Sequence, residues 1–226
     1  LYGYGGFRVS LRPFYLNSVG KNWLERGGVY VVANIRGGGE YGPRWHREAL
    51  KENRHKAFED FEAIAEDLIA KKITSPKYLG IRGGSNGGLL VGSCFTRRPD
   101  LFGAVVCQVP LLDMRRYNRL LAGASWMAEY GNPDKPEEWE YIKTYSPYHN
   151  LSPKTSYPRV LFTTSTKDDR VHPGHARKMV AMMEWMGHPV LYYENTEGGH
   201  AGAANAKQRA YSAALAWTYL LGQLGE

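Results

Sequence analysis

The chain has 226 residues, 43% of them hydrophobic and 23% charged, which suits one large globular domain with a substantial buried core. Its net charge of +7 is interleaved with acidic residues, as in KENRHKAFEDFEAIAEDLIAKK, and this mixture argues against a nucleic-acid partner. The longest apolar stretches, such as GAVVCQVPLL, fall far short of the ~20 residues that cross a bilayer, and two cysteines are too few for a disulfide framework. We therefore expect a soluble protein without a membrane partner, and the sequence does not decide between the cytoplasm and the periplasm.

Short runs of β-branched and aromatic residues alternate along the chain with helical patterns. The expected strands are apolar without alternation, as strands buried on both faces are, and they cover residues 29–35, 78–82, 104–109, 159–164 and 190–194. The expected helices cover residues 56–72, 86–97, 174–186 and 203–221. This alternation predicts an α/β fold, with a mostly parallel sheet that carries helices on both faces, over residues 1–226 as a single domain.

Residues 110–158 interrupt the alternation. This segment is rich in Tyr, Trp and Pro, and it predicts irregular structure or short helices laid over one end of the sheet. Because ligands of such sheets bind beyond the carboxyl ends of the strands, we expect the segment to help wall a site there.

The stretch YLGIRGGSNGGLL places Ser85 in a Gly-x-Ser-x-Gly pattern between an expected strand and an expected helix. In this context the serine sits on a sharp, strained turn, and the glycines let neighbouring chain pass close by without a Cβ clash. The helix that begins near Asn86 directs its free N–H groups to the same place. A flexible surface loop is the alternative, but the apolar residues on both sides favour a catalytic nucleophile.

A serine nucleophile needs a base, and the base needs an acid that orients it. In enzymes with this turn the order along the chain is Ser, then Asp or Glu, then His. Asp168 follows the expected strand 159–164 and His200 follows the strand 190–194, so both lie at the sheet edge that carries Ser85. We assign His200 as the base and Asp168 as its partner, and the spacing leaves Asp169 as a close alternative.

The other histidines carry weaker signals. His172 and His175 have the i, i+3 spacing of helical metal ligands, but no third ligand is evident, so neither a metal nor another cofactor is expected. The remaining histidines stand in polar stretches and are expected at the surface; they are His46, His55, His149 and His188.

The stretches LYGYGGF, NIRGGGEYG, GGSNGG, DDRV and GGHAG, in this order, resemble the catalytic domain of the prolyl oligopeptidase family. The similarity runs from Leu1 to about Gly202, and several motifs in register are more specific than the serine pattern alone. The asparagine that follows the serine resembles the prolyl oligopeptidase branch. The resemblance implies an α/β-hydrolase fold and a serine peptidase that hydrolyses short peptides on the carboxyl side of proline.

The resemblance also implies roles for individual residues. Ser85, Asp168 and His200 match the catalytic triad, and the backbone N–H of Asn86 and the hydroxyl of Tyr4 match the oxyanion hole. The residues that match the substrate-binding site are Trp126, Tyr130, Arg170, Phe7, Val171 and Leu111. The first two of these would wall a proline pocket, where a flat indole stacks on the pyrrolidine ring, and the arginine would hold a substrate carbonyl.

The sequence departs from the family pattern at its start. The oxyanion loop of an α/β-hydrolase follows the third strand, whereas YGYGGF begins here at residue 2, and no segment could form the family's β-propeller. We therefore expect an incomplete hydrolase domain whose first strands and propeller belong to a missing N-terminal part of the same protein. Two other functions stay open: a serine esterase or oligopeptidase of other specificity, such as for acylated residues, and an inert fragment of a longer peptidase.

Overall fold

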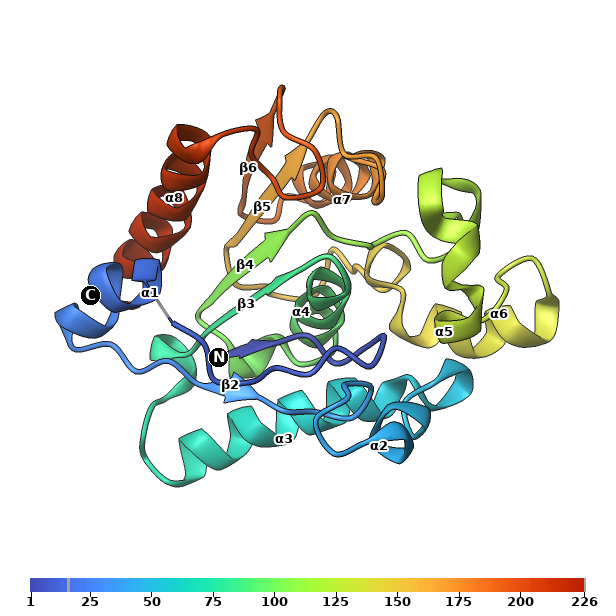
Figure 1. Cartoon of the computed structure of the whole chain (residues 1–226), viewed down its shortest axis with the longest axis horizontal. Coiled ribbons are helices and arrows are strands. Elements are labelled where there is room, and N and C mark those ends of the chain that lie inside the picture. Colours follow the sequence, from blue (N-terminus) through green and yellow to red (C-terminus); the bar gives the residue numbers. More distant parts are fainter. Residues whose placement is uncertain (16, 226) are drawn as a thin grey trace.

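The computed structural model describes residues 1–15 and 17–225, and its centre is a six-stranded parallel sheet (Figure 1). The strands lie side by side in the order β2 (Val32–Ala33), β1 (Tyr2–Gly3), β3 (Gly80–Gly84), β4 (Ala104–Gln108), β5 (Val160–Ser165) and β6 (Val190–Asn195). Neighbouring strands are parallel, with Ile81 beside Val105 and Cys107 beside Phe162. The carboxyl ends of all these strands therefore lie at one edge of the sheet.

Helices cover both faces of this sheet (Figure 1). One face carries α3 (His55–Ala70), α4 (Asn86–Arg97) and α7 (Gly174–Trp185), and the other carries α1 (Asn17–Asn22) and α8 (Ala206–Leu224). Residues of β4 alternate between the two resulting cores, with Val105 and Cys107 in the first and Ala104 and Val106 in the second. Burial on both faces explains why this strand is apolar without alternation, and the expected α/β fold is confirmed.

The first two strands differ from the expectation. The predicted strand 29–35 is reduced to Val32–Ala33, because its neighbour β1 offers only two pairing residues, and β1 itself was not predicted. Helix α8 starts at Ala206, later than predicted, because the side chain of Asn205 caps it by accepting the N–H of Gln208 at 3.0 Å. None of the helices in residues 1–15 and 17–225 combines the length and apolar character needed to cross a bilayer.

Residues 110–158 form short helices beyond the carboxyl end of β4, at the right of Figure 1, as predicted. The α-helices here are α5 (Met127–Tyr130) and α6 (Pro136–Ile142). Short 3₁₀ segments precede and follow them, at Tyr117–Arg119, Leu121–Trp126, Lys143–Tyr145 and Pro147–His149. Elsewhere the chain adds α2 (Pro43–Arg47) and 3₁₀ turns at Leu24–Arg26, Lys51–Asn53, Pro76–Tyr78 and Pro99–Leu101.

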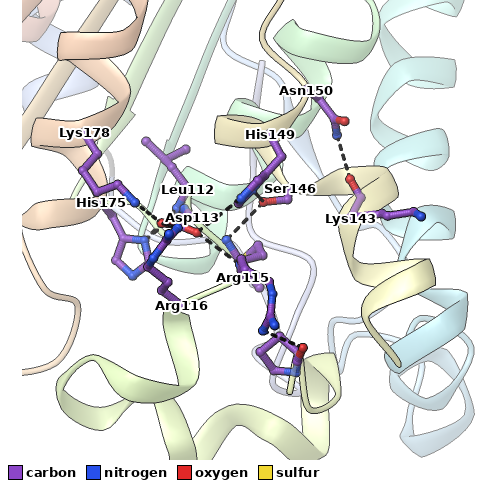
Figure 2. Close-up of polar contacts among 12 residues, drawn as sticks. Leu112, Asp113, Arg115, Arg116, Lys143, Ser146, His149, Asn150, His175 and Lys178 are labelled. Carbon is purple, nitrogen blue, oxygen red and sulfur yellow. Dashed lines mark hydrogen bonds and ion pairs between the residues drawn. The ribbon is translucent and has the colours of Figure 1, made fainter. Parts of the chain in front are cut away.

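A buried carboxylate fastens this segment to the body of the domain. Figure 2 shows Asp113, which is only 1% exposed, beside the side chains of Lys178, Arg116 and His149. Its Oδ2 accepts hydrogen bonds from Lys178 of α7 and, at 3.1 Å, from Arg116, and His149 Nε2 lies 3.9 Å from its Oδ1. Burial alone would raise the pKa of Asp113, but the hydrogen bond and charge of Lys178 outweigh it, so the pKa lies below its usual value.

His175 of α7 holds the same segment through the backbone (Figure 2). Its Nδ1 accepts the N–H groups of Leu112 at 3.2 Å and Asp113 at 3.1 Å, so the proton of the neutral ring lies on Nε2. Burial lowers the pKa of His175 to about 4, since a second proton would face two N–H donors in a dry site. The Nδ1 of His172 likewise accepts the N–H of Gly174, so both imidazole rings accept hydrogen bonds from the backbone. Within residues 1–15 and 17–225 no group of three or more His, Cys, Asp or Glu side chains is placed to hold a metal ion.

We expect His175→Asn to remove a pH dependence from the stability of the protein. The pKa of about 4 in the folded chain lies below the value of about 6.5 in the unfolded chain, so the unfolded chain binds more protons between these values. The wild type should therefore lose about 3 kcal/mol as the pH falls from about 6.5 to about 4. The asparagine keeps an acceptor for the two N–H groups but does not titrate. Urea denaturation of both proteins across this range measures the difference, and parallel pH curves would contradict the expectation.

Candidate active site

Ser85 stands on the turn between β3 and α4 with a strained backbone. Its φ of 59° and ψ of −118° lie where a residue with a side chain is rarely found, as the Gly-x-Ser-x-Gly pattern requires. The chain turns so tightly that a Cβ on Gly83 would stand 2.1 Å from the carbonyl oxygen of Gly87. The turn is anchored by the Ser85 N–H, which donates to Gln108 of β4 at 2.9 Å.

The structure brings Ser85, His200 and Asp168 together from three loops at the carboxyl edge of the sheet. His200 Nε2 lies 3.1 Å from Ser85 Oγ, and its Nδ1 lies 2.8 Å from Oδ2 and 3.0 Å from Oδ1 of Asp168. Asp169, the alternative acid, is exposed to solvent. Within residues 1–15 and 17–225, no hydrogen bond joins its carboxylate to either ring nitrogen of His200. The arrangement can orient the imidazole so that its Nε2 accepts the serine proton.

Asp168 is held as an anion although it is buried. Burial alone would raise its pKa, but the hydrogen bond from His200 and the backbone N–H groups of Arg170 and Val171, each at 2.9 Å, outweigh it and lower the pKa below its usual value. A charged carboxylate accepts the Nδ1–H of His200, which leaves the Nε2 lone pair facing Ser85.

Tyr4 and Asn86 flank the serine from two sides. The hydroxyl of Tyr4, in the loop after β1, hydrogen-bonds the Ser85 side chain. Burial raises the pKa of Tyr4, more than the Ser85 hydrogen bond and the charges of Arg170 and Arg54 lower it, so the hydroxyl keeps its proton. Asn86 is the first residue of α4, and the backbone N–H groups of a first helical turn have no partner within the helix. Both groups are therefore hydrogen-bond donors beside the nucleophile.

The residues predicted to bind substrate divide into two layers. Phe7 and Trp126 are half-buried and Arg170 is exposed, so these three side chains keep accessible surface. Tyr130 is 0% exposed, and Leu111 and Val171 are 2% exposed. The substrate-binding roles of these three buried residues stay predictions, and the ring of Tyr130 lies edge-on to Phe7 with 5.6 Å between the centroids.

Sequence reasoning missed a group of polar residues behind the serine. Arg54 and Glu129 are buried, and His46, expected at the surface, has a side chain only 15% exposed, with its Nε2 2.8 Å from Glu129 Oε2. Arg54 stands in the mixed-charge stretch KENRHK, which is typical of a solvated helix face. No local pattern distinguishes these residues, because their burial comes from segments far away in the sequence.

Comparisons with known proteins agree with this geometry. A family model described as the prolyl oligopeptidase family matches residues 15–226. An uncharacterized peptidase, y4nA, of Sinorhizobium fredii is 57% identical over 224 residues, and a prolyl endopeptidase of Elizabethkingia miricola is 42% identical over 229 residues. A solved structure of a post-proline cleaving enzyme from Rickettsia typhi superposes with a TM-score of 0.97 at 45% identity.

These relatives are much longer than the chain. The matches cover 99% of this chain but 31% of the Sinorhizobium protein, 100% but 32% of the Elizabethkingia protein, and 99% but 33% of the Rickettsia structure. The chain thus spans about a third of the length of the relatives that it matches.

We expect Gly88→Ala and Gly222→Ala, both in helices, to change stability in opposite directions. A Cβ on Gly88, in the helix behind Ser85, would stand 2.7 Å from Cα of Pro110, and overpacking of this kind costs about 1–3 kcal/mol. Gly222 in α8 has nothing within 4 Å of an added Cβ, so the better helix propensity of alanine should stabilise the protein by about 0.5–1 kcal/mol. Denaturant midpoints measure both effects, and equal shifts would show that the packing behind the serine is loose.

Proposed function

Because this chain belongs to the prolyl oligopeptidase family, we propose that it carries the catalytic domain of a serine peptidase that hydrolyses short peptides on the carboxyl side of proline. The observation that carries the proposal is the continuous hydrogen-bond path from Ser85 through His200 to the buried anion of Asp168. The similarity to a prolyl endopeptidase of Elizabethkingia and to a post-proline cleaving enzyme of Rickettsia supports the choice of proline.

The proposed reaction is acyl transfer in two halves. His200 Nε2 takes the proton of Ser85 as the serine oxygen forms a bond to the carbonyl carbon of the prolyl residue. The backbone N–H of Asn86 and the hydroxyl of Tyr4 stabilise the resulting oxyanion. His200 then gives its proton to the leaving amine, the C–N bond breaks, and an acyl-enzyme remains. Water then attacks the ester as His200 takes its proton, and His200 gives that proton to the oxygen of Ser85 as the ester bond breaks and the peptide acid leaves.

The proposed substrate site uses the accessible layer beside the serine. Trp126 and Phe7 supply flat apolar surfaces for a pyrrolidine ring, and Arg170, two residues beyond Asp168, supplies a donor for a substrate carbonyl. The N–H of Ala122 donates to the carbonyl of Arg170 at 3.4 Å, which ties the 3₁₀ segment that ends at Trp126 to the loop of the acid. Tyr130, Leu111 and Val171 shape this wall from behind.

The partner of this domain, in our proposal, is the remaining part of the same polypeptide. A missing N-terminal part with the first strands and a β-propeller would limit substrates to short peptides. The length ratio to the relatives supports a longer parent protein. Activity is therefore best measured on the full-length protein, with this chain alone as a comparison.

We expect Asp168→Asn to lower kcat by about 10⁴-fold, because the amide favours the wrong tautomer of His200. Asp169→Asn is the matched control, since Asp169 is exposed, and it should retain nearly full activity. Turnover of a chromogenic Gly-Pro substrate measures both, with Ser85→Ala as the inactive reference. A fluorophosphonate probe should label Ser85 in the wild type; absence of labelling and turnover in folded full-length protein would support an inert domain and end the proposal.

We expect Trp126→Ala to reduce the preference for proline. Loss of one apolar wall should lower kcat/KM for a prolyl substrate by about 10–200-fold relative to an alanyl substrate. Trp185→Ala is the matched control, because Trp185 is 81% exposed on α7. Comparable wild-type rates on prolyl, alanyl, arginyl and simple ester substrates would instead identify an esterase or a peptidase of other specificity.

A further inference from the structure

Arg54 is a fully buried cation directly behind the nucleophile. It is 0% exposed, and a charge removed from water is tolerated only where partners surround it. Its guanidinium lies over the rings of Tyr130 at 5.3 Å and Phe58 at 5.8 Å from the centroids. Its Nη1 donates to Oε1 of Glu129 at 3.3 Å, and its Nη2 donates to Oδ1 of Asn86 at 2.6 Å. The cation thus reaches a residue of the proposed oxyanion hole.

The side chain of Asn86 connects Arg54 to the loop that carries Tyr4. Its Oδ1 accepts from Arg54 and from the hydroxyl of Tyr130 at 2.7 Å, and its Nδ2 donates to the carbonyl oxygen of Tyr4 at 2.5 Å. Two donors on one side fix which end of the amide is oxygen. One side chain therefore links the backbones that carry both proposed oxyanion donors, Asn86 itself and Tyr4.

Glu129 holds the same loop at a second point. Its Oε1 accepts the backbone N–H of Phe7 at 2.8 Å as well as Arg54, and its Oε2 is bonded to His46. Between the two held positions lies Gly5, whose φ of 63° is a left-handed conformation that glycine adopts without strain. The loop that carries Tyr4 is thus clamped at both ends by groups that all converge on Arg54.

We infer that Arg54, Glu129 and Tyr130 form a buried positioning network that sets the distance between the two oxyanion donors, and that it acts on kcat and not on substrate binding. The inference rests on the proposed acyl transfer. Arg54 and Glu129 reach the oxyanion donors through Asn86 and the loop 4–7, and Tyr130 reaches them through its hydroxyl, which bonds Asn86. Their effect is large because a misplaced donor loses most of its value in a dry site.

The conservative variants Arg54→Lys and Tyr130→Phe test the network. A lysine keeps the charge but lacks the planar guanidinium whose two nitrogen atoms bond Glu129 and Asn86 at the same time. We therefore expect kcat to fall by about 10- to 100-fold, with KM changed less than about twofold. Tyr130→Phe removes one donor to Asn86 and should lower kcat by about 10-fold. Tyr219→Phe is the matched control, since this buried tyrosine bonds the carbonyl of Arg159 and the N–H of Val105 and belongs to the core on the other face of the sheet.

The affinity of a peptidyl prolinal inhibitor distinguishes a positioning role from a merely structural one. Ser85 adds to its aldehyde, and the oxygen of the hemiacetal occupies the oxyanion hole. Its affinity should fall by the same factor as kcat/KM, while the affinity of the prolyl product acid stays unchanged. Equal losses for both ligands, or full kcat in both variants with unchanged folding, would overturn the inference.

Crystal structures of wild type and Arg54→Lys separate this inference from the proposed function. We expect the Tyr4 carbonyl and the Phe7 N–H to shift in the variant relative to Ser85. An unmoved loop would overturn the network even in an active enzyme. A shifted loop in a protein that neither labels nor cleaves would overturn the peptidase proposal instead.

Discussion

The strained backbone of Ser85 is the constraint on which the rest of this structure depends. A non-glycine residue at φ 59° persists only where the surrounding structure determines it, and here β3 pairs with β4 on one side while α4 packs on the sheet on the other. The same turn that lifts the hydroxyl above the sheet edge starts α4 at Asn86. Nucleophile, helix N-terminus and the link to Tyr4 are consequently set by one local conformation.

Three buried carboxylates organise the irregular segments around that turn. Asp168 accepts backbone N–H groups of its own loop, Glu129 accepts the N–H of Phe7, and Asp113 accepts the N–H of Arg115 at 3.2 Å. Each is also paired with a basic side chain, His200, Arg54 and Lys178 respectively. Loops at the sheet edge have few backbone partners of their own, so buried anions supply the acceptors that secondary structure would otherwise provide.

The sequence predicts the features that arise from local patterns, and it misses those that depend on residues far apart in the chain. The strands at 104–109 and 159–164 were predictable because burial on both faces leaves an apolar run, and the serine turn because strain demands glycines at fixed spacing. The order of Ser85, Asp168 and His200 followed from strand ends that share one edge. By contrast, β1 is two residues long and leaves no periodic trace, and the buried state of Arg54, His46 and Tyr130 is produced by partners from distant segments.

Phe7 belongs both to the loop that carries Tyr4 and to the wall that we propose for the substrate. This bulky residue has a φ of 55°, a conformation that costs energy for any side chain, and its N–H is held by Glu129 while its ring rests edge-on against Tyr130. The half-buried face that remains is part of the wall we propose for proline. The bond from Glu129 at Phe7 and the bond from Asn86 at Tyr4 lie three residues apart on one loop. The proposed pocket wall and the proposed oxyanion donor therefore share one short backbone segment.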